Sequence, residues 1–130
     1  ERISRKRVRR DLMVNIYAFD VDDTLWLSNG PVQLQQLIYL KNQGHILGLC
    51  GAWQKVVNSL DGWQNLFSFV GGETSEIGKV MILKQLKDST RVDRYIMVGN
   101  FGYGGQSKDK EQAEQAGWEF IQEKDFKEGL

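Results

Sequence analysis

The sequence predicts a three-layer α/β sandwich built on a mainly parallel sheet of five strands. Short apolar runs alternate along the chain with longer segments whose apolar residues recur at helical spacing. The connections between successive strands are long enough to cross over the sheet, as parallel pairing requires. This alternation is typical of an open sheet with helices on both faces, a Rossmann-like arrangement.

In the first half of the chain, a buried strand is expected at residues 14–19, where apolar, β-branched and aromatic residues run into an acidic loop. After the Asn29-Gly30-Pro31 turn, apolar residues at helical spacing predict an amphipathic helix that ends before Gly44. A second apolar strand is expected at residues 45–50, and a short helix at 52–60, stopped by Asp61-Gly62.

In the second half, residues 66–70 are the third expected strand, closed by two glycines. Helical spacing of apolar residues predicts a helix over 75–87, and residues 95–98 form the fourth expected strand. A glycine-rich loop then leads to a charged helix over about 107–115, which Gly117 ends. The fifth expected strand spans residues 118–121.

The chain is expected to contain one domain, residues 13–130, preceded by a basic extension at residues 1–12. The extension holds six basic and two acidic residues, whereas the rest of the chain holds 11 basic and 15 acidic residues. The domain therefore lacks the basic surface of a nucleic-acid binder, and nucleic acid is a partner only through the arm. The other interpretation of the arm is a disordered tail or a segment outside the natural product.

The remaining composition favours a cytoplasmic protein without a membrane partner. No apolar run approaches the roughly 20 residues that span a bilayer. The single cysteine, Cys50, has no partner for an intramolecular disulfide, which fits a reducing compartment. The oligomeric state does not follow from these features.

Polar residues that follow the expected strands form the candidate site, because ligands of parallel α/β sheets bind beyond the carboxyl ends of the strands. Asp20 and Asp22 follow the first strand, Asn100 follows the fourth, and Asp109 begins the last helix. Carboxylate, amide and carbonyl oxygens are the ligands that Mg²⁺ prefers. We therefore predict a Mg²⁺ site at Asp20, the backbone near Asp22, Asn100 and Asp109.

The spacing of Asp20 and Asp22 places both side chains on the same side of an extended segment. Two neighbouring carboxylates can divide the work of a reaction, because their pKa values are pushed apart. One can attack phosphorus while the other holds a proton for the leaving oxygen. This interpretation predicts a covalent aspartyl-phosphate intermediate.

The run Ile16-Tyr17-Ala18-Phe19-Asp20-Val21-Asp22-Asp23-Thr24-Leu25 resembles the first signature motif of the haloacid-dehalogenase-like superfamily. The resemblance extends from Met13 to about Ile121, and Val98-Gly99-Asn100 followed by Asp109 is similar to the last motif of that family. It implies that Asp20 is the nucleophile, Asp22 the general acid/base and Thr24 a support for the loop. Lys79 would neutralise the phosphoryl group and contribute to phosphate binding. The short segments 26–31 and 71–74 imply that no cap domain covers the site.

Two positions depart from the family pattern. Gly51 stands where the family has a phosphate-binding Ser or Thr, so that only its backbone N–H is expected to reach the phosphate. Asn100 stands where the family has a metal-binding aspartate, and we expect weaker metal affinity because one negative charge is lost.

These features support two functions of different classes. The leading prediction is a Mg²⁺-dependent phosphohydrolase whose open site admits a phosphorylated substrate, macromolecules included. The alternative is a degenerate, non-catalytic domain that binds a phosphorylated or protein partner, because Gly51 and Asn100 both depart from the catalytic pattern. A phosphatase guided to nucleic acid by the basic arm is a variant of the first.

Overall fold

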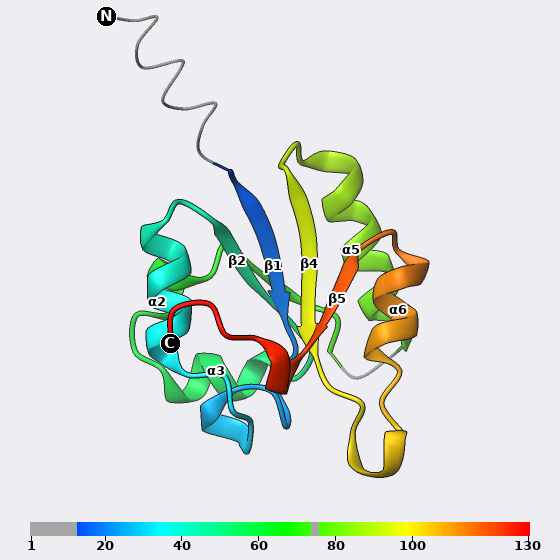
Figure 1. Cartoon of the computed structure of the whole chain (residues 1–130), viewed down its shortest axis with the longest axis horizontal. Helices are drawn as coiled ribbons and strands as arrows, with labels where there is room; N and C mark the ends of the chain where they lie inside the picture. The colour runs from blue at the N-terminus through cyan, green and yellow to red at the C-terminus, as the bar shows by residue number, and fades with distance from the viewer. Residues whose placement is uncertain (1–12, 74–75) are drawn as a thin grey trace, which may run out of the picture.

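The computed structural model describes residues 13–73 and 76–130, and these residues build one five-stranded sheet (Figure 1). Its strands are β1 (Asn15–Phe19), β2 (Ile46–Cys50), β3 (Phe69–Gly71), β4 (Arg94–Gly99) and β5 (Glu119–Gln122). The strand order is β3-β2-β1-β4-β5, and each neighbouring pair is parallel. The predicted α/β class is confirmed, and the arrangement is Rossmann-like. The predicted basic extension lies outside the described residues.

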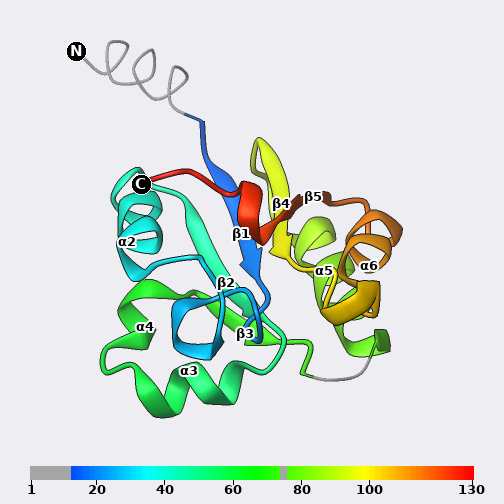
Figure 2. The same ribbon diagram turned by 60° about the horizontal axis from the view of Figure 1, so that its bottom comes forward.

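Helices cover both faces of the sheet, which makes three layers (Figure 2). On one face lie α2 (Leu34–Asn42), α3 (Trp53–Ser59) and α4 (Trp63–Leu66). On the other lie α5 (Glu76–Ser89) and α6 (Asp109–Gln115). Short 3₁₀ turns are η1 (Trp26–Ser28), η2 (Tyr103–Gly105) and η3 (Glu123–Asp125). Among the helices of the described part, none has the length and apolar content needed to cross a bilayer.

The central strand β1 supplies both cores, because side chains alternate between the two faces of a strand. Tyr17 and Phe19 pack into the core under α2 to α4, whereas Ile16 and Ala18 pack under α5 and α6. All four are buried, which explains why β1 is an unbroken apolar run rather than an alternating one.

The third strand lies later than predicted. Leu66 and Phe67 were expected to begin it, but Leu66 ends α4 and the strand starts at Phe69. The N–H of Phe67 donates to the carbonyl of Trp63 (2.9 Å), and this helical turn buries Leu66 and Phe67 in the α2 to α4 core. A short apolar run indicates burial but does not distinguish a strand from a buried helical turn.

The C-terminal residues close the core beyond β5. The ring of Phe126 lies edge-on to Tyr17 and Phe19, with centroids 6.1 and 5.6 Å apart. The buried amide of Gln36 on α2 donates to the carbonyls of Phe126 (3.1 Å) and Glu128 (3.0 Å). These contacts attach the end of the chain to α2 and were not predicted from the sequence.

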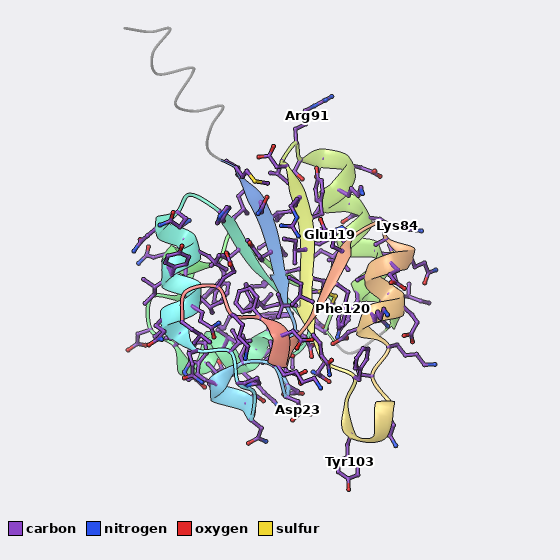
Figure 3. The ribbon with its side chains drawn as sticks, in the orientation of Figure 1. Asp23, Lys84, Arg91, Tyr103, Glu119 and Phe120 are labelled. Carbon is purple, nitrogen blue, oxygen red and sulfur yellow. The ribbon has the colours of Figure 1, made fainter. Side chains whose placement is uncertain are left out.

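The carboxyl ends of the strands lie at the lower end of the molecule in Figure 1. Phe19 pairs with Leu49 of β2 and with Val98 of β4, so the residues that follow these strands lie at the same edge. Figure 3 shows Asp23 and Tyr103 at this end and Arg91 at the opposite end. The strand order reverses beside β1, which makes this edge the expected place for a ligand site.

Candidate active site

Asp20 lies at the centre of the site, directly after β1. Its backbone N–H donates to the carbonyl of Val98 (2.9 Å), which extends the β1–β4 pairing by one residue. The side chain is buried, and its two oxygens face different partners. Oδ1 accepts a hydrogen bond from Lys79 Nζ (3.0 Å), and Oδ2 accepts one from Asn100 Nδ2 (2.9 Å).

The loop after Asp20 is held by backbone hydrogen bonds and by a close glycine contact. The N–H groups of Thr24 and Leu25 both donate to the carbonyl of Val21 (3.2 and 3.0 Å), which forms one tight turn. A Cβ at Gly30 would lie 1.9 Å from the backbone carbon of Thr24, so only glycine fits there. Thr24 itself is fully buried, and its supporting role stays a prediction.

Asn100 connects β4 to the loop after β1. Besides Asp20, the backbone carbonyl of Asp22 (2.8 Å) and Oγ1 of Thr24 (3.0 Å) lie within hydrogen-bond distance of its Nδ2, whose two N–H groups are shared among these three acceptors. Its Oδ1 accepts a hydrogen bond from the N–H of Gly102 (2.7 Å). One buried amide therefore organises both the catalytic loop predicted from the sequence and the start of the glycine-rich loop.

Lys79, on α5, lies between two buried carboxylates. Its ammonium group is 3.0 Å from Oδ1 of Asp20 and 2.8 Å from Oδ1 of Asp109. The other oxygen of Asp109 accepts the backbone N–H of Asn100 (3.2 Å). The structure thus brings Lys79 and Asp109 into the site as predicted, with Asp109 directed at Lys79.

The environment changes the acidity of the central groups. Burial, and next the charge of Asp109, raise the pKa of Asp20 from 3.8 to about 6, although Lys79 acts in the opposite direction. Burial lowers the pKa of Lys79, but the charges of Asp20 and Asp109 outweigh it and leave the pKa above its usual value. At neutral pH the site therefore holds an ammonium group beside an ionised but poorly solvated Asp20.

Asp22 lies apart from this buried cluster. Its side chain is about half exposed and pairs with Lys55 of α3 (Nζ to Oδ1, 2.5 Å), while Ser28 donates to the same oxygen (2.7 Å). Burial raises the pKa of Asp22, but the hydrogen bonds from Lys55 and Ser28 outweigh it and leave the pKa lowered. Asp22 is therefore anionic at neutral pH, which disfavours the proton-donating half of its predicted role.

Sequence reasoning missed Lys55 as a member of this site. A usable signal existed, because Lys55 belongs to the first turn of the helix that follows β2 and therefore lies at the same edge of the sheet. Ser28 had no such signal, since it enters through the fold of the loop around Gly30.

Gly51 makes a close approach to Asp20. A Cβ at position 51 would lie 2.4 Å from Oδ1 of Asp20, which leaves no room for the Ser or Thr of the family pattern. The N–H of Gly51 donates to the carbonyl of Gly71 (2.9 Å). The carbonyl of Gly71 therefore competes with a phosphate for this N–H. The clearer contribution of Gly51 is that its missing side chain leaves room for Asp20.

A cavity of about 450 Å³ opens over these residues. One wall comes from the glycine-rich loop, whose exposed Tyr103 projects from the lower end of the molecule in Figure 3. On another side, Trp53 Nε1 donates to Glu73 Oε1 (3.2 Å). The lining residues are Asp20, Asp22, Asp23, Ala52, Glu73, Lys79, Asn100, Gly102, Tyr103, Gln106 and Ser107.

Cys50, at the end of β2, is a second side chain near the site whose type can act as a nucleophile. Burial raises the pKa of its thiol to about 12. The side chain packs in the core beneath α5, and it stays a thiol at neutral pH. Asp20 is therefore the better candidate for a nucleophile.

The residues present fit a Mg²⁺ ion poorly in this arrangement. The space between Asp20 Oδ2 and the Asp22 carbonyl is spanned by the Asn100 amide nitrogen, which is a donor. Asp109, the other predicted ligand, is engaged by Lys79 and the Asn100 N–H. Within residues 13–73 and 76–130, no cluster of three or more His, Cys, Asp and Glu side chains has the arrangement of a metal site.

Comparisons with protein-family models, with curated proteins and with solved structures find no match to this chain. The fold and the site themselves define a Rossmann-like α/β protein with a buried aspartate–lysine–aspartate cluster at the carboxyl ends of its strands. What this site can do follows from its own residues.

Proposed function

We propose that this chain is a phosphohydrolase of the haloacid-dehalogenase-like type, without a cap domain, and that Asp20 is its nucleophile. The observation that carries the proposal is the contact of buried Asp20 with Lys79 at the floor of an open cavity. A carboxylate with little solvation beside a fixed ammonium group is suited to attack a phosphoryl group, whose negative charge the ammonium stabilises.

In the first step, one oxygen of Asp20 forms a bond to phosphorus, and the bond between phosphorus and the ester oxygen breaks. The leaving group takes the bonding electron pair and departs as a stable anion, or as an alcohol that receives its proton from solvent. In the second step, water attacks phosphorus, the Asp20–phosphorus bond breaks, and inorganic phosphate leaves. Lys79 supports both steps, because among the residues that the structure describes two of its three N–H groups hold Asp20 and Asp109, which leaves the third for phosphate.

Asp22 is assigned to the second step. Its lowered pKa makes it an anion at neutral pH, as a base that accepts a proton from the attacking water must be. The first step then depends on leaving groups that are stable as anions, or on a proton from solvent. Aryl phosphates have such leaving groups and are the appropriate first substrates.

The open cavity supports a large substrate. Its lining includes Glu73, which Trp53 contacts, and the loop around Tyr103, and the connections at residues 26–31 and 71–74 are short. A phosphate on a protein or on the end of another macromolecule fits this class better than a small molecule that must be enclosed.

The test is hydrolysis of para-nitrophenyl phosphate by the full chain and by the Asp20→Asn variant. We expect turnover by the wild type and a loss of at least about a thousandfold in the variant. The exposed Asp61→Asn is the matched control and should retain the wild-type rate. Acid quenching during turnover should trap a phosphoryl group on the peptide that contains Asp20. Equal rates in wild type and Asp20→Asn would contradict the proposal.

A second candidate function is binding of a phosphorylated partner without turnover. It is favoured by one observation, the engagement of both Asp20 oxygens by Lys79 and Asn100, which holds the carboxylate in place. A binding module should retain its partner after Asp20→Asn and lose it after Lys79→Met. An enzyme should lose turnover in both variants.

A further inference from the structure

We propose that the side-chain amide of Asn100 takes the place of a divalent cation in this site, so that Asp20 is organised by an amide and a lysine without a bound metal ion. The inference deepens the proposed function, on which it rests only for the role of Asp20 as the reacting group. Its physical claim concerns ion binding and can be tested without turnover.

The first argument is the set of atoms around Asn100 Nδ2. Within 3.0 Å lie a carboxylate oxygen of Asp20, the backbone carbonyl of Asp22 and the hydroxyl of Thr24. These are hard oxygen atoms of the kinds that coordinate Mg²⁺. They come from one loop and converge on one point, and the atom at that point is the amide nitrogen.

The second argument is the orientation of the amide. The N–H of Gly102 donates to Asn100 Oδ1 (2.7 Å), so the amide oxygen has its hydrogen-bond partner on the side away from Asp20. With the amide reversed, its NH₂ group would face the Gly102 N–H and its oxygen would face a carboxylate and a carbonyl. Only the orientation with nitrogen inward pairs each donor with an acceptor. A cation at this point would therefore have to displace the amide.

The third argument is charge. Asp20, Asp109 and Lys79 form a buried cluster with a formal charge of −1 when both carboxylates are ionised. An aspartate at position 100 would add another buried negative charge beside Asp20, and such a cluster would need a cation. The neutral Asn100 keeps the loop contacts and removes that need.

The experiment is Mg²⁺ titration by calorimetry of the wild type, Asn100→Asp, and the exposed Asn42→Asp as a matched control. We expect no saturable Mg²⁺ binding by the wild type or Asn42→Asp at low-millimolar concentrations. Asn100→Asp should bind Mg²⁺ at least about tenfold more tightly than the wild type, because it gains a charged ligand. Adding Asp20→Asn to Asn100→Asp should abolish that binding.

Thermal melting gives a second readout. Without Mg²⁺, Asn100→Asp should melt below the wild type, and Mg²⁺ should raise its melting temperature by several degrees more than that of the wild type. Saturable Mg²⁺ binding by the wild type that Asp20→Asn abolishes would overturn the inference, even if Asn100→Asp does not fold. Equal Mg²⁺ affinity of wild type and Asn100→Asp would also overturn it.

Hydrolysis separates this inference from the proposed function. Aryl phosphatase activity of the wild type that a chelator leaves unchanged supports both. Absence of hydrolysis together with absence of Mg²⁺ binding by the wild type contradicts the phosphohydrolase and supports the role of Asn100. Activity that requires Mg²⁺ contradicts the role of Asn100 and supports the phosphohydrolase.

Discussion

The ammonium group of Lys79 lies 3.0 Å from Oδ1 of Asp20, although the two residues are 59 positions apart in the sequence. The same group is 2.8 Å from Asp109, whose side chain is almost fully buried. One lysine thus compensates two carboxylates that have little access to water. The stability and the chemistry of the site both depend on this arrangement.

Removal of the lysine should destabilise the protein strongly. We expect Lys79→Met to lower the free energy of unfolding by about 3–5 kcal/mol at pH 7, because two buried carboxylates lose their compensating charge. The loss should be smaller at pH 5, below the pKa of about 6, because Asp20 is then protonated in the wild type as well and Lys79 compensates less charge there. Urea denaturation at both pH values measures this, with the exposed Lys84→Met on the same helix as control. A loss below about 1 kcal/mol, as for a surface ion pair, would contradict the buried arrangement.

The protonation of Asp20 should make stability depend on pH. Because burial and Asp109 raise its pKa from 3.8 to about 6, the folded protein retains a proton on Asp20 that the unfolded chain has already lost. The contribution of Asp20 is therefore fully present below pH 3.8 and is lost as the pH rises through about 6. We expect a decrease on the order of 3 kcal/mol across this window.

This decrease should be absent from Asp20→Asn. Subtracting the unfolding free energies of the variant from those of the wild type at each pH removes the contributions of other groups. A difference that is constant across the window, or that grows with pH, would show that Asp20 has an ordinary or lowered pKa.

The rate of hydrolysis should also depend on the ionisation of Asp20, and it should rise with pH where the free energy of unfolding falls. In the proposed mechanism Asp20 attacks phosphorus only as a carboxylate, so we expect kcat/KM for an aryl phosphate to rise as the pH increases through about 6. A pH–rate profile of the wild type measures this. A rate that is independent of pH from 4 to 8 would be inconsistent with Asp20 as the nucleophile.

A side chain at position 51 should displace Asp20. We expect Gly51→Ser to lower the free energy of unfolding by about 1–3 kcal/mol, because its Cβ would lie 2.4 Å from Oδ1 of Asp20. Gly104→Ser, which has open space and a positive φ of 68°, is the control and should cost about 1 kcal/mol or less. Denaturant unfolding compares the two. Equal losses would mean that backbone conformation, and not contact with Asp20, determines the effect.

The ion pair between Lys55 and Asp22 should affect the pKa of Asp22 more than the free energy of unfolding. Both side chains are more than half exposed, so Lys55→Met should change the free energy of unfolding by less than about 1 kcal/mol. The pKa of Asp22 should rise in this variant, because Lys55 is one of the groups that lower it. Titration of Asp22 by NMR measures the change, with Lys41→Met as control. An unchanged pKa would show that Lys55 is not among the groups that lower it.

Much of the fold could be predicted from the sequence, because each strand of a doubly covered sheet is a short apolar run. The first, second, fourth and fifth strands lie within about two residues of their predicted positions. The third could not be placed, since Leu66 and Phe67 are buried through a helical turn. The C-terminal segment also escaped prediction, because Phe126 and Gln36 meet only through tertiary packing.

The sequence predicted which residues belong to the candidate site better than it predicted which atoms of these residues contact one another. Asp20, Asn100, Lys79 and Asp109 do converge, because the carboxyl ends of parallel strands share one edge. The sequence carried a signal for Lys55 as a member of the site, but its contact with Asp22 depends on how α3 packs against the sheet, which the sequence does not encode locally.

The sequence by itself determined which residues follow which strand, because apolar periodicity depends only on near neighbours in the chain. It therefore placed an aspartate, an asparagine and a second aspartate at one edge of the sheet. Only the tertiary structure decided where their polar atoms point. The Asn100 amide takes its direction from Asp20 and Thr24, which precede it by 80 and 76 positions. Hydrogen-bond complementarity among such distant groups decides whether that edge presents a metal site or, as the contacts indicate here, a buried amide and a lysine.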